Sequence, residues 1–195
     1  EANFKNKKVL DIGAGTGRLT LLFAPIVKEI HALDIEESQV AFLKRKVKNQ
    51  EIENVIPVVG SAEKLSFKNN SFDIVISSFT IGGRDQKKAI QEILRVLKPG
   101  GKCIITDAHS GEFIELWENH SDPGIKAIVL KQYHDLLKLH TFKTKLIKSN
   151  WRFPTVSKAV EQLGYVLGGH VGSYLEENKK KEISMKAFML TGTKK

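Results

Sequence analysis

In the first half of the chain, short apolar runs alternate with longer stretches in which apolar residues recur every three or four positions. The short runs predict buried strands at 8–12, 29–34, 55–59, 72–77 and 102–107. The longer stretches predict helices at 19–27, 36–48 and 87–97. Strands and helices that alternate in this way usually form parallel pairs with right-handed crossovers, so the pattern predicts an open α/β sheet.

The regular alternation stops after the fifth predicted strand. No strand is convincing within 108–153, where helices are predicted at 113–118 and from Asp122-Pro123 to about Leu139. A helix at 155–163 and strands at 165–171 and 184–190 follow. The charged connection at 176–182 indicates that the last two strands form an antiparallel hairpin. We therefore predict one domain over residues 1–195, with a helical insertion at 108–153 that acts as an acceptor-binding lid.

Composition excludes few functions. Hydrophobic residues make up 41% and charged residues 27%, as in ordinary globular proteins. A single cysteine, Cys103, excludes a disulfide framework, and the absence of a signal peptide or a membrane-length apolar run adds to the prediction of a cytoplasmic protein. The histidines show no spacing typical of a metal site, so no metal is predicted. The net charge of +9 allows an anionic partner without requiring one.

The first strand ends in a glycine-rich turn, VLDIGAGTGR at 9–18. A turn of this kind between a strand and a helix presents backbone N–H groups to an anionic or polar ligand. No Lys-Ser or Lys-Thr pair follows at P-loop spacing, and Arg18 stands where a dinucleotide fold has its third glycine. Asp34 ends the second strand at the distance where an acid accepts ribose hydroxyls. The ligand predicted from these residues is a ribonucleoside joined to a group less anionic than pyrophosphate.

Five stretches in order then carry a resemblance to a known family: VLDIGAGTGR (9–18), HALDIE (31–36), VVGSAEKLSF (58–67), FDIVISSF (72–79) and ILRVLKPGGKCIITD (93–107). They resemble the successive motifs of class I S-adenosylmethionine-dependent methyltransferases, most closely those that methylate small molecules. The resemblance implies a Rossmann-like, seven-stranded and mostly parallel sheet with helices on both faces and an antiparallel C-terminal hairpin. It also implies S-adenosylmethionine as the methyl donor and S-adenosylhomocysteine as the product.

The resemblance further implies which residues bind this cofactor. Asp11 and the glycine turn would face its methionine portion, Asp34 its ribose, Ile35 its adenine, and the turn after the third strand would lie beside the adenine. The complete predicted set is Asp11, Gly13, Ala14, Gly15, Thr16, Gly17, Asp34, Ile35, Ser61, Ala62, Glu63, Ser77 and Ser78. Family members often carry Asp at the position of Ser61 to hold the adenine amino group. Serine offers an uncharged acceptor there, unless Glu63 compensates.

The catalytic group is less well defined than the cofactor site. Transfer from a sulfonium depends mainly on positioning, and a base is needed only for an acceptor that arrives protonated. The end of the fourth strand lacks the Asn/Asp-Pro-Pro-aromatic signature of enzymes that methylate exocyclic amines. Asp107 and His109 are candidate bases at the end of the fifth strand, whereas Cys103 at its start is predicted to be core. The candidate acceptor-binding residues are Phe79, Arg84, His109, Trp117 and Tyr133.

Residues 125–152 carry seven basic residues against one acidic residue. This segment would meet an anionic small molecule, bind nucleic-acid phosphates, or simply form a solvated helix face. The leading hypothesis is methyl transfer to a small-molecule acceptor, which is anionic in one interpretation. The alternatives are methylation of RNA or protein and binding of S-adenosylmethionine without turnover, while Arg18 disfavours a nicotinamide oxidoreductase. Both a monomer and a homodimer are compatible with the sequence.

Overall fold

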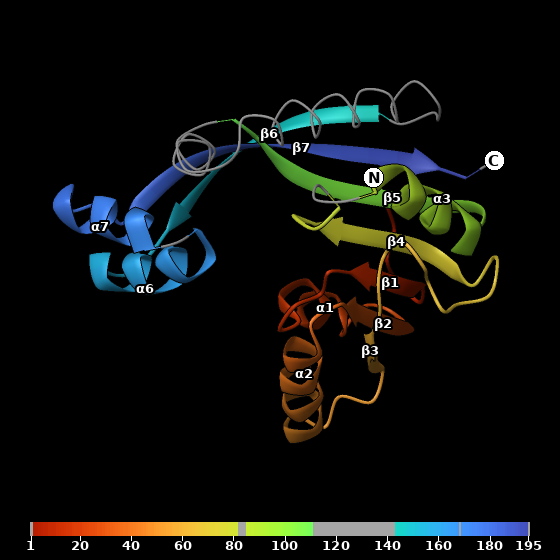
Figure 1. The fold of residues 1–195 in the computed structure, drawn as a ribbon. Helices are drawn as coiled ribbons and strands as arrows, with labels where there is room; N and C mark the ends of the chain where they lie inside the picture. The colour runs from red at the N-terminus through yellow and green to blue at the C-terminus, as the bar shows by residue number, and fades with distance from the viewer. Residues whose placement is uncertain (1, 82–84, 111–142, 168, 195) are drawn as a thin grey trace. The chain divides into compact units, whose positions relative to one another are not determined.

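The computed structural model describes residues 2–81, 85–110, 143–167 and 169–194 (Figure 1). The strands are β1 (Lys8–Ile12), β2 (Glu29–Asp34), β3 (Val55–Val59), β4 (Phe72–Ser78), β5 (Leu97–Ser110), β6 (Lys143–Arg152) and β7 (Glu182–Thr193). The helices are α1 (Arg18–Phe23), α2 (Glu37–Asn49), α3 (Gln86–Val96), α6 (Val156–Leu167) and α7 (Gly169–Glu177). The described residues form two compact units. One contains the chain up to Asp107 and its end from Met189, and the other contains Lys145 to Phe188.

The seven strands form one sheet in the order β3-β2-β1-β4-β5-β7-β6. The four pairs among β1 to β5 are all parallel. Ile12, the last residue of β1, pairs with Leu33 on one side and with Ser77 on the other. The predicted Rossmann-like, mostly parallel sheet is thus confirmed. Its carboxyl-terminal edge, where such folds hold their ligands, brings together the ends of β1, β2, β3 and β4.

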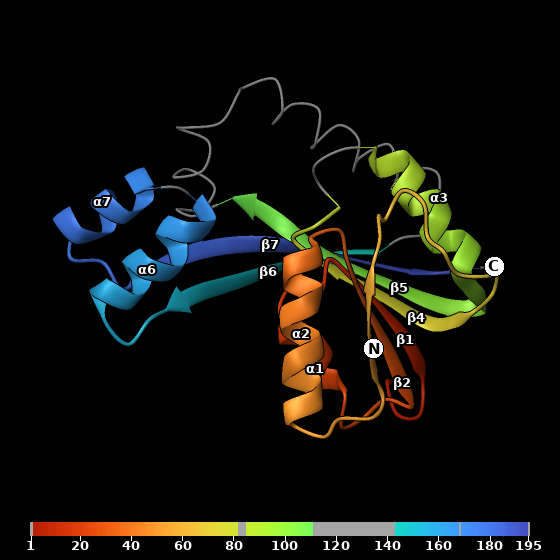
Figure 2. The same cartoon turned by 60° about the horizontal axis from the view of Figure 1, so that its bottom comes forward.

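Both faces of the parallel strands are covered by helices, with α1 and α2 on one side and α3 on the other (Figure 2). Val9, Ile30 and Ile74 form one buried cluster with residues of α1 and α2, including Leu43. Neighbouring strand residues such as Leu10 point to the opposite face, because side chains alternate along a strand, and they are buried as well. This two-sided burial explains why the parallel strands appear in the sequence as nearly continuous apolar runs.

The C-terminal strands are antiparallel, as predicted, but they are not the strands that the sequence indicated. The N–H of Phe153, just after β6, donates to the carbonyl of Lys181, just before β7, at 2.8 Å. Gly100 and Gly101, near the start of β5, exchange hydrogen bonds with Lys194, which follows β7. In each pair the end of one strand therefore lies beside the start of the other.

Two sequence predictions in the second half of the chain are wrong. The strand predicted at 165–171 is occupied by the end of α6 and the start of α7. The described buried residues of the two helices follow helical spacing, with Ala159 and Leu163 four residues apart and Val171 and Leu175 likewise, so the period was misassigned. The prediction of no strand within 108–153 is also wrong, because β6 occupies 143–152. β6 stands last in the sheet, and the lysines of an edge strand obscure its alternation. The helices predicted at 113–118 and 122–139 lie outside the described residues.

β5 is longer than predicted because it begins before the Lys98–Gly101 turn. Phe72 pairs with Leu97, whereas Ile74, two residues later, pairs with Lys102. The intervening residues of β5 therefore form a bulge between the two pairs. Gly100 lies in this bulge with φ of 75°, and nothing lies within 4 Å of where its side chain would begin.

Gly17 joins the glycine turn to α1 and has no room for a side chain. Its φ is 88°, and a Cβ at this position would lie 2.4 Å from Cδ1 of Leu43 in α2. Leu43 is itself only 1% exposed, so it has little space into which to move. A glycine here allows the turn to pack closely on α2.

We expect Gly17→Ala to lower the free energy of unfolding by about 3 kcal/mol, combining left-handed backbone strain with overpacking against Leu43. Gly100→Ala is the matched control, because it shares the positive φ without the steric overlap, and it should cost only about 1 kcal/mol. Urea unfolding of the two variants beside the parent protein measures both values. Equal losses in the two variants would contradict the packing argument.

Candidate functional site

The glycine turn is held by the end of the neighbouring strand. The N–H groups of Gly13 and Ala14 both donate to the carbonyl of Leu33, at 2.8 and 3.0 Å. The next glycine, Gly15, donates its N–H to Oδ2 of Asp34 at 2.7 Å. The turn is therefore shaped by contacts to β2 within the protein itself.

Asp34 is the acid predicted at the end of β2, and its carboxylate bridges two backbone segments. Besides the bond from Gly15, its Oδ1 accepts the N–H of Glu36 at 2.9 Å. Each carboxylate oxygen has more than one acceptor site, so both oxygens retain capacity for a hydroxyl of a ligand. Asp34 also lines a pocket, as required for its predicted role.

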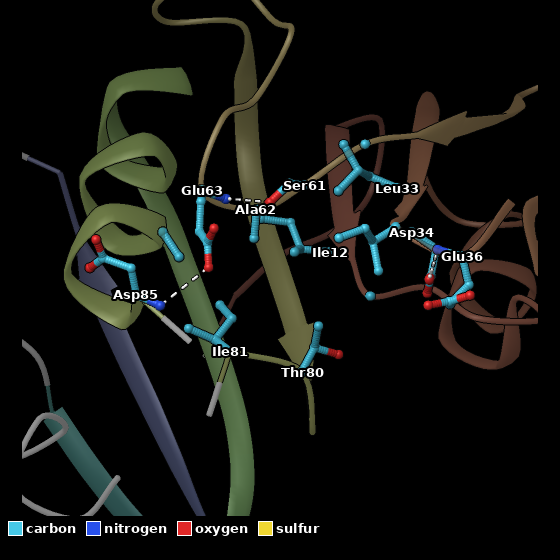
Figure 3. A pocket seen from close by; sticks show the side chains of 14 residues that line it. Ile12, Leu33, Asp34, Glu36, Ser61, Ala62, Glu63, Thr80, Ile81 and Asp85 are labelled. Carbon is cyan, nitrogen blue, oxygen red and sulfur yellow. Dashed lines mark hydrogen bonds between the residues drawn. The ribbon is translucent and has the colours of Figure 1, made fainter. Parts of the chain in front are cut away.

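A pocket of about 320 Å³ opens along the carboxyl-terminal edge of the parallel strands, within the size range of small-molecule sites. Asp34 and Glu36 lie at one end, Glu63 and Asp85 lie at the other, and Ile12 and Ala62 stand between them (Figure 3). The full lining is Ile12, Gly13, Leu33, Asp34, Ile35, Glu36, Gly60, Ser61, Ala62, Glu63, Thr80, Ile81, Asp85 and Ala89. Six of the predicted cofactor residues are in this set: Gly13, Asp34, Ile35, Ser61, Ala62 and Glu63.

The turn after β3 is tied to the start of α3. Oγ of Ser61 accepts the N–H of Glu63 at 3.2 Å, and Oε1 of Glu63 accepts the N–H of Asp85 at the same distance. Asp85 caps α3 by accepting the N–H of Lys88 at 3.1 Å. The side chains of Ser61 and Glu63 thus both shape the far end of the pocket.

Asp11 was predicted to face the ligand, and in the structure it is a buried support of the turn. It does not line the pocket, and its Oδ2 accepts the hydroxyl of Thr20 in α1 at 2.6 Å. Burial raises the pKa of Asp11 to about 6, against the opposing effect of the hydrogen bonds from Thr20. Any contact of Asp11 with a cofactor stays a prediction.

The end of β4 contributes to the pocket through Thr80 and Ile81, which the sequence did not single out. Oγ of Ser78 accepts the hydroxyl of Thr106 in β5 at 3.0 Å, while Ser77 is buried with an Oγ that has no partner among the described residues. Phe79 has a φ of 57°, and its N–H donates to the carbonyl of Thr106 at 2.9 Å. None of these three residues lines the pocket, but the next two, Thr80 and Ile81, do.

Thr80 packs directly over the glycine turn. A Cβ added to Gly13 would lie 2.0 Å from Oγ1 of Thr80, so only a glycine allows this approach. The hydroxyl of Thr80 donates to the carbonyl of Ser78 at 3.1 Å, which holds the side chain in place. Sequence reasoning missed eight residues that line the pocket: Ile12, Leu33, Glu36, Gly60, Thr80, Ile81, Asp85 and Ala89. Asp85 carried a recognisable signal, as a helix N-cap two residues before the predicted start of the helix at Lys87.

The remaining predicted residues are only partly described. Ala14, Gly15, Thr16 and Gly17 form the turn without lining the pocket. Asp107 and His109 lie in β5, but the side chain of His109 lies outside the described residues, as do Arg84, Trp117 and Tyr133 entirely. Cys103 is core, as predicted, and burial raises the pKa of its thiol to about 12. Across the described ranges, no group of three or more metal-binding side chains gathers.

Comparison with known proteins gives the class of the chain. The family model described as "Methyltransferase domain" matches residues 3–159, and the chain belongs to this family. Its seven-stranded, mostly parallel sheet agrees with the Rossmann-like fold that the family resemblance implied.

Individual relatives carry the same class name. The chain is similar to an uncharacterized methyltransferase, YcgJ, of Bacillus subtilis, with 36% identity over 106 residues, which cover 54% of this chain and 42% of that protein. It is also similar to the ubiquinone/menaquinone biosynthesis C-methyltransferase UbiE of Wigglesworthia glossinidia brevipalpis, with 29% identity over 160 residues, covering 73% of this chain and 64% of UbiE. The chain thus spans about two fifths to two thirds of the length of these relatives.

Solved structures agree on the fold. The crystal structure of YcgJ from Bacillus subtilis superposes with a TM-score of 0.73 at 22% identity, covering 100% of this chain and 94% of that one. A structure titled as a SAM-dependent methyltransferase from Aquifex aeolicus superposes with a TM-score of 0.59 at 15% identity, covering 100% and 85%. These likenesses support the same Rossmann-like architecture.

The buried carboxyl of Asp11 predicts a pH-dependent stability. Its pKa in the folded protein lies above that of an exposed carboxyl, so folding loses stability as the pH rises from about 4 through 6. Asp11→Asn keeps an acceptor for the Thr20 hydroxyl and removes the charge. Above pH 7 the variant should exceed the parent protein in unfolding free energy by up to about 3 kcal/mol, and at pH 4 this gain should be absent.

Urea unfolding at pH 4 and pH 7.5 checks this sign. Asp73→Asn is the control, because the pKa of Asp73 is shifted in the opposite direction. Burial acts to raise the pKa of Asp73, but the hydrogen bonds from Lys98 and from the N–H of Lys8 outweigh it and lower the pKa. The Asp73 variant should therefore lose stability at pH 7.5. A loss of the same kind in Asp11→Asn would contradict the assignment.

Proposed function

We propose that this chain binds S-adenosylmethionine in the pocket at the strand ends and transfers its methyl group, by in-line displacement, to a small molecule. The observation that carries the proposal is the Asp34 carboxylate, which holds the Gly15 N–H and lines the pocket. When bound, the cofactor supplies an activated methyl group on a sulfonium. The chain's own task is then to position the two reactants, for which alignment contributes roughly 7–11 kcal/mol.

The pocket fits a nucleoside of this kind. The Asp34 carboxylate has free acceptor sites for two ribose hydroxyls, and Ile35 beside it is 57% exposed, so its side chain is available to pack on a flat base. Gly13 has no side chain, and Thr80, which lines the pocket, takes that space at the turn. Ala62 stands between the two ends of the pocket and Glu63 lies at the end opposite Glu36, where a base attached to the ribose would extend (Figure 3).

We propose a small molecule as the methyl acceptor. The relatives named UbiE act in ubiquinone and menaquinone biosynthesis by their printed name, which favours a small-molecule acceptor. We propose Asp107 or His109 as the group that orients or deprotonates an acceptor that arrives protonated. The candidate acceptor contacts are Phe79, Arg84, Trp117 and Tyr133, and residues 108–153 are a candidate lid.

No helix among the described residues is long and apolar enough to cross a membrane. The buried, free Cys103 fits a reducing compartment, and we propose a cytoplasmic location.

A second acceptor class is favoured by one feature of β6. Lys143, Lys145 and Lys148 are all exposed on this strand, and exposed lysines suit either an anionic small molecule or the phosphates of RNA. The described part of the chain shows no further feature that favours RNA. We therefore keep RNA as the alternative acceptor.

Asp34→Ala should abolish the response to cofactor. S-adenosylhomocysteine at 100 times its dissociation constant should stabilise the parent protein by roughly 2.7 kcal/mol, and NAD should not stabilise it. The variant loses the ribose acceptor, so its melting temperature should rise little on addition of the same ligand. Glu37→Ala, an exposed residue of α2 outside the pocket, is the control and should respond like the parent. A full response of the Asp34 variant would mean that the ribose contact is misassigned.

Neutralising Lys143, Lys145 and Lys148 together separates the acceptor classes. If RNA is the acceptor, the parent protein should be retained on RNA at low salt. The triple Gln variant should then bind RNA more weakly, and its binding should depend less on the salt concentration. We expect no retention of the parent, in keeping with a small-molecule acceptor. Filter binding at 50 mM and 200 mM salt makes the measurement, and tight, salt-sensitive binding of the parent would overturn our choice.

A further inference from the structure

A second cavity, of about 390 Å³, opens where the parallel strands begin. It is lined by Asn3, Lys7, Asp73, Ile74 and residues 98–102, and we call it the lysine pocket. These residues lie at or near the starts of β1, β4 and β5, which are adjacent and parallel in the sheet. The pocket of the proposed function lies where the strands end. The length of a strand, roughly 20 Å for β4, therefore separates the two cavities.

The lining of the lysine pocket carries three lysines and one carboxylate. This carboxylate, on Asp73, is already engaged within the protein. Its Oδ1 accepts the ammonium group of Lys98 at 2.8 Å, and its Oδ2 accepts the N–H of Lys8 at the same distance. Among the described residues, the ammonium group of Lys7 makes no ion pair. The lining thus contains two more lysines than carboxylates, and Lys7 can bind an anion without giving up an ion pair with these residues.

Backbone contacts hold the walls of the lysine pocket in place. The carbonyl of Lys7 accepts the N–H of Lys28 at 2.9 Å, which fixes the backbone from which the Lys7 side chain extends. On the other wall, a Cβ at Gly101 would lie 2.8 Å from the carbonyl oxygen of Lys98 and 3.1 Å from that of Asp73. Charged surface stretches are usually solvated, whereas these lysines line a cavity with a supported backbone.

We infer that the lysine pocket binds a small molecule that carries a phosphate monoester. Lysine ammonium groups form charge-assisted hydrogen bonds with phosphate oxygens. A phosphate monoester brings roughly two negative charges at neutral pH, which matches the excess of lysines over carboxylates in the lining.

The organic part of the ligand has room in the same cavity. The volume lies within the range of small-molecule sites, and nothing lies within 4 Å of where a side chain of Gly100 would begin. Because the cavity lies at the other edge of the sheet from the Asp34 carboxylate, this ligand and the methyl donor can be bound at the same time.

Calorimetry with ribose 5-phosphate tests the inference, with ribose as the uncharged comparison. The parent protein should bind the phosphate ester and not the sugar. Lys7→Gln should weaken binding about tenfold, because it removes the charge of one phosphate contact and leaves the pair of Asp73 and Lys98 intact. Lys102→Gln is a second variant of the same lining and should weaken binding likewise. Lys44→Gln, at an exposed position of α2 outside the lining, makes the same change of charge and should bind like the parent.

Saturating S-adenosylhomocysteine separates this site from the cofactor pocket. The affinity of the parent for ribose 5-phosphate should be unchanged in its presence, and displacement of the probe would overturn the inference. Equal affinity of the parent and both lining variants would overturn it too, as would displacement by a single-stranded RNA without terminal phosphates. Absence of probe binding beside intact binding of S-adenosylhomocysteine would overturn this inference alone. Failure to bind S-adenosylhomocysteine would instead overturn the proposed function and leave the lysine pocket standing.

Discussion

The contact between the Gly15 N–H and the Asp34 carboxylate is the interaction on which the site depends. Parallel pairing of β1 with β2 ends at Ile12 and Leu33, and the next three amides of the turn still bind β2, two through the Leu33 carbonyl and one through Asp34. The path of the turn is therefore a continuation of sheet pairing. A turn held in this way is organised before any ligand arrives, so binding does not have to supply the free energy of ordering it.

The opposite wall of the pocket is held by α3. Besides the Glu63 contact at its start, Glu92 of this helix accepts the N–H of Leu65, and Arg95 donates to the carbonyls of Leu65 and Phe67. Three turns of one helix thus fix the connection between β3 and β4. The pocket is bounded by two independently supported walls, one built on β2 and the other on α3. Asp34 and Glu36 lie at the first end, and Glu63 and Asp85 lie at the second, so both ends carry carboxylates.

The parallel strands could be predicted from the sequence because they are short apolar runs, and β1, β2 and β3 each end at an acid or just before a glycine. β1, β2 and β3 have the predicted bounds, and the glycine turn and Asp34 lie where strand ends meet. The second half could not be predicted in the same way. Tyr165 to Val171 contains aromatic and β-branched residues that favour a strand, but it lies in α6 and α7, whose described buried residues recur every four positions and which pack against each other. Tertiary packing overrode local preference there.

The part of the site that the sequence did not reveal depends on an unusual backbone conformation just after β4. Thr80 reaches the pocket because Phe79 adopts a left-handed φ of 57°, a conformation that no motif announces. Asp11 and Ser77 are buried polar residues near the ends of β1 and β4, and Oγ of Ser77 has no partner among the described residues. Folding alone would favour apolar side chains at these positions. Polar residues buried beside the glycine turn are what a site under selection for function would retain at the expense of stability. Cys103 is equally buried, but core residues surround it, so it is not one of the residues of the site.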